Sequence, residues 1–156
     1  MQKYGWSTAQ AQEMNARMEK TAAGDGLEFN LADLVSGNTK DAHRLLVIAD
    51  DQELQGDLLE RFYRAYFTER RSLFDRHTLA TLAGEAGMNP ERALAALDSE
   101  EGEALVLADL LESRSMGITG VPFFVIDGKH SISGAQARTV FADAITRAWS
   151  EAHHDA

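Results

Sequence analysis

The sequence predicts a mostly helical α+β protein that contains one β-hairpin followed by a last helix. Helix caps and helix-ending glycines recur from Ser7 to Gly117. A short apolar run, Phe123–Ile126, then leads into an Asp-Gly turn. The chain has 156 residues and a hydrophobic fraction of 44%, which is sufficient for a globular core.

The first helix is predicted to begin at Ser7. Ser7 and Gln10 have the spacing of a capping box, in which the hydroxyl and the amide each bind a free backbone N–H group. The helix runs to Gly24–Gly26, where two glycines favour a stop. Leu27–Leu31 follows as a short extended or loop segment.

Two further helices are expected between residues 38 and 67. Asn38 or Thr39 caps the first of them, which continues through about Ala49. The second carries a broad apolar stripe at helical spacing, a pattern that is typical of a core helix. The stripe consists of Leu54, Leu58, Leu59, Phe62, Tyr63, Tyr66 and Phe67.

Three more helix starts precede the hairpin. Asp75 is predicted to cap a helix that ends at Gly87. Asn89–Pro90 begins the next one, with proline at its first position. Ser99 is predicted to cap a long helix that ends at Gly117.

The hairpin is predicted from its two strands and its turn. Phe123–Ile126 is rich in aromatic and β-branched residues and indicates a strand buried on both faces. Asp127–Gly128 favours a two-residue type I′ turn, and Lys129–Ser133 is the returning strand. A cis bond is expected between Val121 and Pro122, since X-Pro is the bond that adopts cis readily.

The last helix is predicted to bury one apolar side against the hairpin. Its apolar residues are Val140, Phe141, Ala144, Ile145 and Trp149. From Ser150 the tail is polar, and we expect it to fray.

Composition excludes some classes of partner. The formal net charge of −10 disfavours nucleic acids and anionic membranes, which select for basic patches. No apolar run approaches the roughly 18 residues of a transmembrane helix. The first residues lack the basic-then-apolar pattern of an export signal, so a cytoplasmic location is expected.

Several separated motifs carry a family resemblance. Gly120–Gly128 followed by Ser133–Gln136 resembles the C-terminal signature of the DsbA family, in its FrnE-like branch of disulfide oxidoreductases. Asn38–Leu46 and Ala65–Glu69 resemble the helical insertion of that branch. Met1–Gly5 already resembles the interior of a family member, so the chain corresponds to about the last two-thirds of one, as in a truncated protein.

The resemblance implies a partial thioredoxin-like fold with a large helical insertion domain. Residues 1–117 would form the helical insertion domain, and residues 118–150 the second half of the thioredoxin-like core, a hairpin and a helix. Residues 151–156 would be a tail. The first half of such a core, a strand, a helix that begins with Cys-x-x-Cys and a second strand, has no counterpart in this sequence.

The sequence contains no cysteine. A dithiol oxidoreductase works through a thiolate that attacks a disulfide sulfur, and no other side chain replaces it. We therefore assign no catalytic residue and no cofactor, and whether the chain is an enzyme stays open. As written, it does not carry out the family's reaction alone.

The resemblance places substrate binding at Gly120, Val121 and Pro122. In the family, the residue before the cis-proline offers its backbone to an extended peptide or protein thiol substrate by strand addition. The aromatic stripe would line the groove that faces this substrate, although a role in the core is the simpler interpretation. A proline that merely begins a strand is the alternative for Pro122.

Without the first half of the core, Phe123–Ile126 would be an apolar strand at the edge of the sheet. Bare apolar edges pair with other chains or aggregate. We therefore expect a homo-oligomer, such as a dimer, or a complementing chain at this edge, or a helical swap that covers it.

The histidines do not indicate a metal site. His43 lies beside Asp41 and Arg44 and is expected at a helix surface or interface, as a structural hydrogen bonder rather than a catalyst. His77 is expected in the first turn of its helix and His130 in packing or solvent. None of the paired spacings typical of zinc sites occurs.

Three hypotheses follow. The first is the C-terminal portion of a FrnE-like thiol-disulfide oxidoreductase that is inactive alone. The second is a non-catalytic thioredoxin-like module for peptide binding or dimerisation. The third is a relative of the 2-hydroxychromene-2-carboxylate isomerases and kappa-class glutathione transferases, which use glutathione. Phe123–Phe124 and the run Ser133–Gln136 favour the first over the third.

Overall fold

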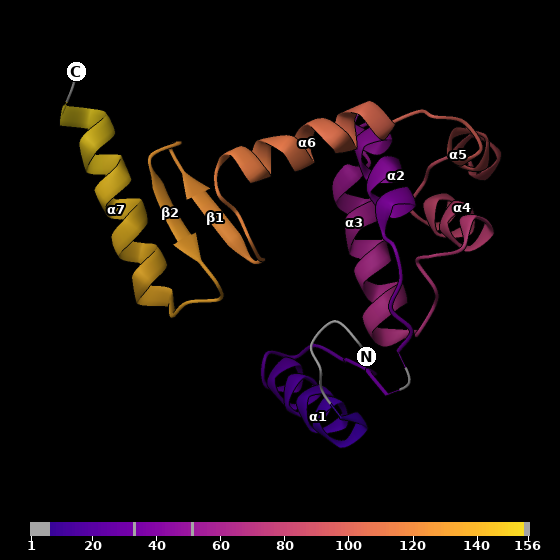
Figure 1. Cartoon of the computed structure of the whole chain (residues 1–156), viewed down its shortest axis with the longest axis horizontal. Coiled ribbons are helices and arrows are strands. Elements are labelled where there is room, and N and C mark those ends of the chain that lie inside the picture. The colour runs from indigo at the N-terminus through magenta and orange to yellow at the C-terminus, as the bar shows by residue number, and fades with distance from the viewer. Residues whose placement is uncertain (1–6, 33, 51, 155–156) are drawn as a thin grey trace. The chain divides into compact units, whose positions relative to one another are not determined.

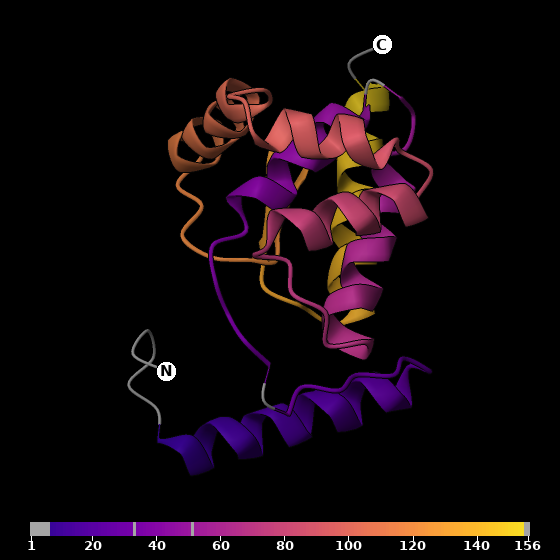
Figure 2. The same ribbon diagram turned by 90° about the vertical axis from the view of Figure 1, so that its right-hand side faces the viewer.

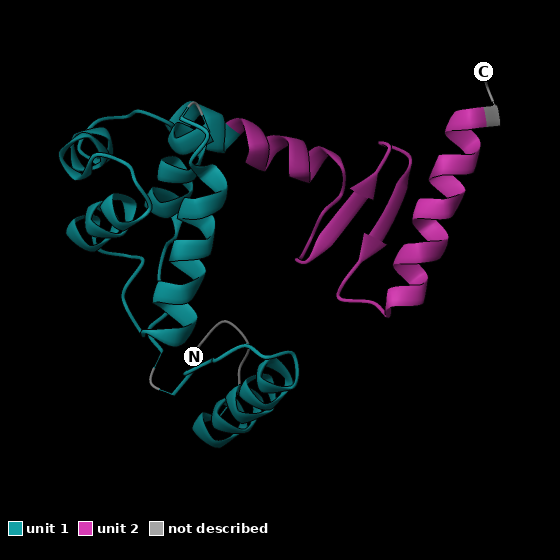
Figure 3. Cartoon of the chain, turned by 180° about the vertical axis from the view of Figure 1, so that it is seen from behind, with its two compact units in different colours: residues 1–107 teal, residues 108–156 magenta. Residues whose placement is uncertain are grey.

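The computed structural model describes residues 7–32, 34–50 and 52–154. Met1–Gly5, and with it the start of the predicted helical domain, lies outside these residues, as do the last two residues of the predicted tail. The chain divides into two compact units, residues 1–107 and 108–156 (Figure 3). The division falls inside helix α6 (Glu103–Ser115), before the domain boundary predicted at residue 117.

Helix α1 (Thr8–Gly24) begins as predicted. The Ser7 backbone N–H donates to Gln10 Oε1 at 2.8 Å, and the Gln10 N–H donates to Ser7 Oγ at 3.2 Å, which completes the capping box. Residues 27–31 then run back along α1 as an irregular segment (Figure 2). Asn15 Nδ2 donates to the Leu31 carbonyl at 3.1 Å, and the Leu31 N–H donates to Glu19 Oε1 at 2.6 Å.

Four helices enclose the core of the first unit (Figure 1). They are α2 (Lys40–Asp50), α3 (Gln55–Tyr63), α4 (Arg76–Glu85) and α5 (Pro90–Leu97). Asp75 caps α4 by accepting from the Thr78 N–H at 2.8 Å. Asn89 caps α5 by accepting from the Arg92 N–H, also at 2.8 Å. Both predicted caps are confirmed.

The helix predicted over the aromatic stripe changes character near its end. After α3 the chain continues as a π-helical segment, η1 (Arg64–Thr68). Leu58 and Phe62 are buried, but Tyr63 is 52% exposed. Consecutive helical residues are about 100° apart, so one face does not bury the whole stripe. The prediction that the entire stripe is core is therefore wrong at Tyr63.

Ser99 does not cap α6. The helix begins four residues later, at Glu103. The Ser99 hydroxyl donates to the Ala96 carbonyl at 2.8 Å and accepts from the Glu101 N–H at 3.1 Å, so it belongs to the turn after α5. Gly102 has a φ of +76°, and a Cβ there would lie 3.1 Å from the Arg44 carbonyl oxygen. This tight turn delays the start of α6 relative to the prediction.

The second unit contains the predicted hairpin, with α7 (Arg138–His154) alongside it (Figure 1). Strands β1 (Phe123–Ile126) and β2 (His130–Ser133) are antiparallel and pair from Phe123 with Ser133 to Ile126 with His130. This register leaves three connecting residues rather than the two predicted. Asp127 and Gly128 both have positive φ, as expected for the turn.

Burial in the second unit contradicts two predictions. Strand β1 is not buried on both faces, since Phe124 is 40% and Val125 is 44% exposed. In α7, Val140, Ile145 and Trp149 are exposed, and Phe141 and Ala144 are half-buried. The reason is geometric, because a two-stranded hairpin covers a narrow strip of one helix side.

The end of α7 is also more ordered than predicted. The helix continues to His154 instead of fraying from Ser150. The Ser150 hydroxyl donates to the Thr146 carbonyl at 2.9 Å, and Glu151 Oε2 lies 2.8 Å from His130 Nε2 on β2. These contacts tie the last turns to the helix and to the hairpin.

Candidate functional site

Gly120, Val121 and Pro122 form the loop that enters β1, and all three are exposed. The Val121–Pro122 peptide bond is cis. The Pro122 carbonyl accepts from the Gly134 N–H at 2.8 Å, which fixes the loop to the end of β2. Val121 is 90% exposed, and its backbone makes no hydrogen bond to another described residue. The loop therefore presents an accessible backbone group beside a strand.

Strand β1 has one free edge in the described part of the chain. The sheet there has two strands in the order β1–β2, so β2 covers one edge of β1. The other edge leaves backbone N–H and C=O groups available for a further strand. This edge continues directly from the Val121–Pro122 loop.

The second unit exposes apolar side chains on both its strand β1 and its helix α7. On β1 and α7 they are Phe124, Val125, Val140, Ile145 and Trp149. Phe124 contacts Phe141 edge to face, with ring centroids 4.9 Å apart, so one face of β1 packs on α7. A strand that has a free edge and exposes its own apolar side chains, Phe124 and Val125, is typical of an interaction site.

The histidines lie in separate places. His43 is exposed on α2, and His77 lies in the first turn of α4 as predicted. His130 pairs with Glu151, a contact that the sequence did not reveal. The side chain of His154 lies outside the described residues. Within residues 7–32, 34–50 and 52–154, no group of three or more His, Asp or Glu side chains is suited to hold a metal ion.

Sequence reasoning missed the burial of Arg44, which has no exposed surface. Its guanidinium donates to one carboxylate and to four backbone carbonyls, two in the last turn of α5 and two in the turn that follows. The acceptors are the carbonyls of Ala96 (2.7 Å), Leu97 (3.3 Å), Ser99 (2.6 Å) and Glu101 (2.9 Å) and Asp41 Oδ1 (3.0 Å). Every one of these is a structural partner, so Arg44 holds the fold rather than a substrate.

Asp41 connects this buried arginine to the surface. Burial raises the pKa of Asp41, but hydrogen bonds from Arg76 and Arg44 outweigh it and hold the pKa below its ordinary value. Arg76 Nε lies 2.9 Å from Asp41 Oδ2. The carboxylate therefore stays charged and completes the hydrogen bonding of both arginines.

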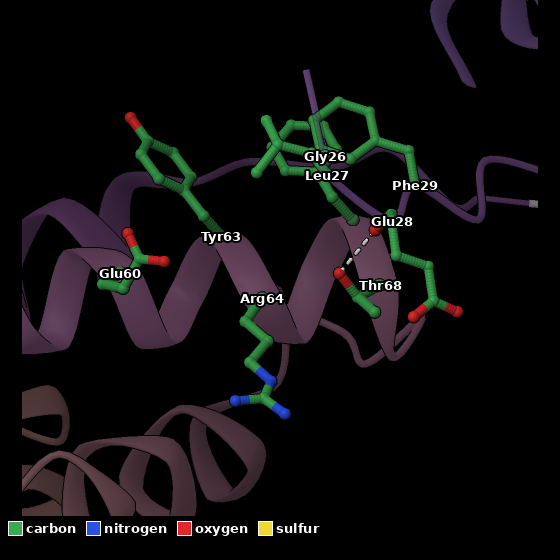
Figure 4. A pocket seen from close by; sticks show the side chains of 9 residues that line it. Gly26, Leu27, Glu28, Phe29, Glu60, Tyr63, Arg64 and Thr68 are labelled. Atoms are coloured by element: carbon green, nitrogen blue, oxygen red, sulfur yellow. Dashed lines mark hydrogen bonds between the residues drawn. The ribbon is translucent and has the colours of Figure 1, made fainter. Parts of the chain in front are cut away.

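The first unit carries an open groove of about 620 Å³ along α3 and η1 (Figure 4). Residues 26–29 form one side, and Glu60, Tyr63, Arg64 and Phe67 line the helix side. The rings of Phe29 and Phe67 stack with centroids 4.7 Å apart. Thr68 Oγ1 donates to the Glu28 carbonyl at 2.7 Å and fixes the two sides together.

Comparison with known proteins places the fold. The family model for the DSBA-like thioredoxin domain matches residues 1–146. Among solved structures, the chain is similar to a probable DsbA oxidoreductase from Streptomyces coelicolor, with 41% identity and a TM-score of 0.89. The comparison with curated proteins returned no match. Within the described residues, no helix is long and apolar enough to cross a membrane.

The Streptomyces match covers 96% of this chain and 65% of the other. The chain thus spans slightly less than two-thirds of the length of that relative. Mostly helical structure, a small antiparallel sheet and the matched fold confirm the predicted α+β class. The chain belongs to the family of DSBA-like thioredoxin domains.

Proposed function

We propose that this chain supplies the substrate-binding loop and the helical part of a FrnE-like thiol-disulfide oxidoreductase. The redox cysteines would come from another polypeptide segment, because this sequence has none. The observation that carries the proposal is the free edge of β1, a strand that continues from the exposed Val121 backbone and exposes Phe124 and Val125. A cytoplasmic location remains a prediction.

The chemistry divides between the two parts. In the oxidising direction, a substrate thiolate attacks one sulfur of the disulfide on the complementing segment and releases the other sulfur as a thiolate. A second substrate thiolate then attacks the substrate sulfur of this mixed disulfide and releases the remaining sulfur of the segment as a thiolate. The substrate thereby gains a disulfide, and the segment becomes a dithiol. The role of this chain is to hold the substrate backbone at Gly120–Pro122 by strand addition.

The complementing segment would add to the free edge of β1. Val125 on the strand and Ile145 and Trp149 on α7 are exposed. An added strand would satisfy the free backbone groups of β1, and a helix or strand following it would cover these side chains. The same addition would bring the cysteine pair to the Val121 loop.

The first experiment is an intact-mass measurement on the endogenous protein and on any protein that copurifies with it. After reduction and thiol alkylation, we expect either a species heavier than 17.1 kDa or a bound partner that gains mass from alkylated cysteines. A lone species of 17.1 kDa with no alkylated partner would contradict the proposal. The isolated chain should not catalyse insulin reduction in either case.

The free edge equally supports a second candidate, a non-catalytic module that binds peptides or dimerises through β1. Sedimentation velocity separates this candidate from the first. A stable dimer that no cysteine-containing segment dissociates favours the module. Binding to immobilised glutathione would instead favour the isomerase or kappa-class alternative. If Val125→Lys abolishes dimerisation or glutathione binding, the site responsible for that binding lies at β1.

A further inference from the structure

We propose that the groove along α3 and η1 binds a cationic segment of a partner polypeptide, in which an arginine or lysine adjoins an apolar residue. The groove lies wholly in the first unit, between residues 26–29 and the helix. The proposal does not depend on the redox function, because it concerns a site that needs no cysteine.

The apolar part of the groove is exposed and well supported. Leu27 is 54% and Tyr63 is 52% exposed. The ring of Tyr63 lies 6.1 Å from that of Phe67, which in turn stacks on Phe29. Figure 4 shows Tyr63 and Leu27 on the same side of the helix. Aromatic rings in this arrangement accept an apolar side chain or the aliphatic stem of a cation.

The groove is held open by hydrogen bonds that do not involve its free surface. The Asn30 N–H donates to the Phe67 carbonyl at 2.7 Å, and Asn30 Nδ2 donates to the Thr68 carbonyl at 2.7 Å. With the Thr68–Glu28 bond, these contacts fix residues 28–30 to the end of η1. A partner therefore meets a surface whose two sides are already in place.

The charges of the groove favour a cation. Glu60 is exposed and pairs with no other described residue. Arg64, in contrast, points away from Tyr63 in Figure 4, and its Nε lies 3.5 Å from Glu69 Oε1. Glu28 does not add to this charge, because its carboxylate accepts from Asn30 Nδ2 at 3.3 Å and points away from Tyr63 in Figure 4. A free carboxylate beside the exposed Tyr63 ring is the combination that binds a guanidinium or ammonium group through ion pairing and cation–π contact.

The test uses a short, fluorescently labelled peptide without cysteine, in which an arginine and a phenylalanine are set in a Gly/Ser background. Fluorescence polarisation measures its affinity for the full chain. Replacing the arginine of the peptide by glutamate should abolish binding, and replacing the phenylalanine by serine should weaken it. Binding should also weaken as salt is raised, because the ion pair is exposed.

Two variants of the chain locate the site. Tyr63→Ala should weaken binding of the peptide by about tenfold, as expected for an aromatic contact of this kind. Glu60→Gln should weaken binding of the arginine peptide but leave the affinity for an uncharged phenylalanine peptide unchanged. Glu112→Gln, on exposed α6 outside the groove, is the matched control and should have no effect.

Three results would overturn the proposal. One is the absence of binding at about 1 mM peptide, since that corresponds to negligible affinity. Another is equal binding to the parent chain and to Tyr63→Ala, with circular dichroism showing both folded. The third is equal affinity for the charged and uncharged peptides, which would indicate a merely apolar groove.

Discussion

The two units use the same kinds of apolar residue for different purposes. In the first unit, Leu45, Leu58, Leu79, Leu82 and Leu97 have no exposed surface. In the described part of the second unit, Ile132 and Ala148 are the buried apolar residues, whereas Ile145 and Trp149 are largely exposed. Apolar periodicity therefore identifies a helix face that needs a partner, but it does not say whether the partner lies in the same chain.

The largest effect is expected from Arg44, which stabilises the first unit alone. Arg44→Ala removes the side-chain donor to the Ser99 carbonyl and one of the donors to the Ala96 carbonyl and to the Asp41 carboxylate, all in a buried site. We expect a loss of about 3–5 kcal/mol in the free energy of unfolding, measured by urea denaturation. Arg92→Ala removes an exposed ion pair with Glu101 and should cost less than about 1 kcal/mol. Equal losses in the two variants would refute the structural role of Arg44.

The next effect compares the two units directly. Leu58→Ala creates a cavity in the first unit and should cost about 2–5 kcal/mol in the same assay. Ile145→Ala in the second unit should cost less than about 0.5 kcal/mol, because Ile145 is 55% exposed. A large loss from Ile145→Ala would mean that the second unit buries this residue within the chain or in an oligomer, and a concentration series distinguishes these cases.

A smaller effect is expected from acid. Hydrogen bonds from Arg71 and Arg61 hold the pKa of Glu85 below its ordinary value of 4.5. A pKa that is lower in the folded than in the unfolded chain stabilises the fold above the unfolded value. This stability should decline as the pH falls through 4.5 towards the folded pKa.

Glu85→Gln should reduce this acid sensitivity and lower stability at neutral pH, as measured by urea denaturation at several pH values. Glu112→Gln serves as the control and should leave the pH profile unchanged. An unaltered profile for Glu85→Gln would show that the pairs with Arg61 and Arg71 do not form in solution.

The smallest effect on stability is expected at Trp149, which is 67% exposed. Trp149→Ser should change the free energy of unfolding by less than about 0.5 kcal/mol. It should nevertheless reduce self-association, or binding of a complementing segment, in sedimentation velocity runs. If association is unchanged, the docking surface lies away from this side of α7.

Local sequence signals predicted the elements well. The caps at Ser7, Asp75 and Asn89 occur as expected, because a cap is a contact between residues three apart. The hairpin and the positive φ of its turn were likewise predicted from Asp127 and Gly128, although the connection has three residues and not the two expected. Such features depend on residues that are close in the sequence, so they can be predicted from one sequence alone.

Features that depend on distant residues were not predictable. The start of α6 was misplaced at Ser99 because the turn there closes around Arg44, far away in the sequence. The exposure of Ile145 and Trp149 was missed because it depends on what covers α7. The role of the loop Gly120–Pro122 was predicted from the family resemblance. The groove at Tyr63 was not predictable from local patterns, because its shape depends on the packing of Phe29 on Phe67.

Arg44 also constrains the order in which the chain can fold. Its carbonyl acceptors lie 52 to 57 residues further along the sequence. The hydrogen bonds from Arg44 to the turn between α5 and α6 therefore form only after α2 has reached α5. The local bonds of Ser99 can form earlier, and we expect closure of the turn around Arg44 to be a late step of folding.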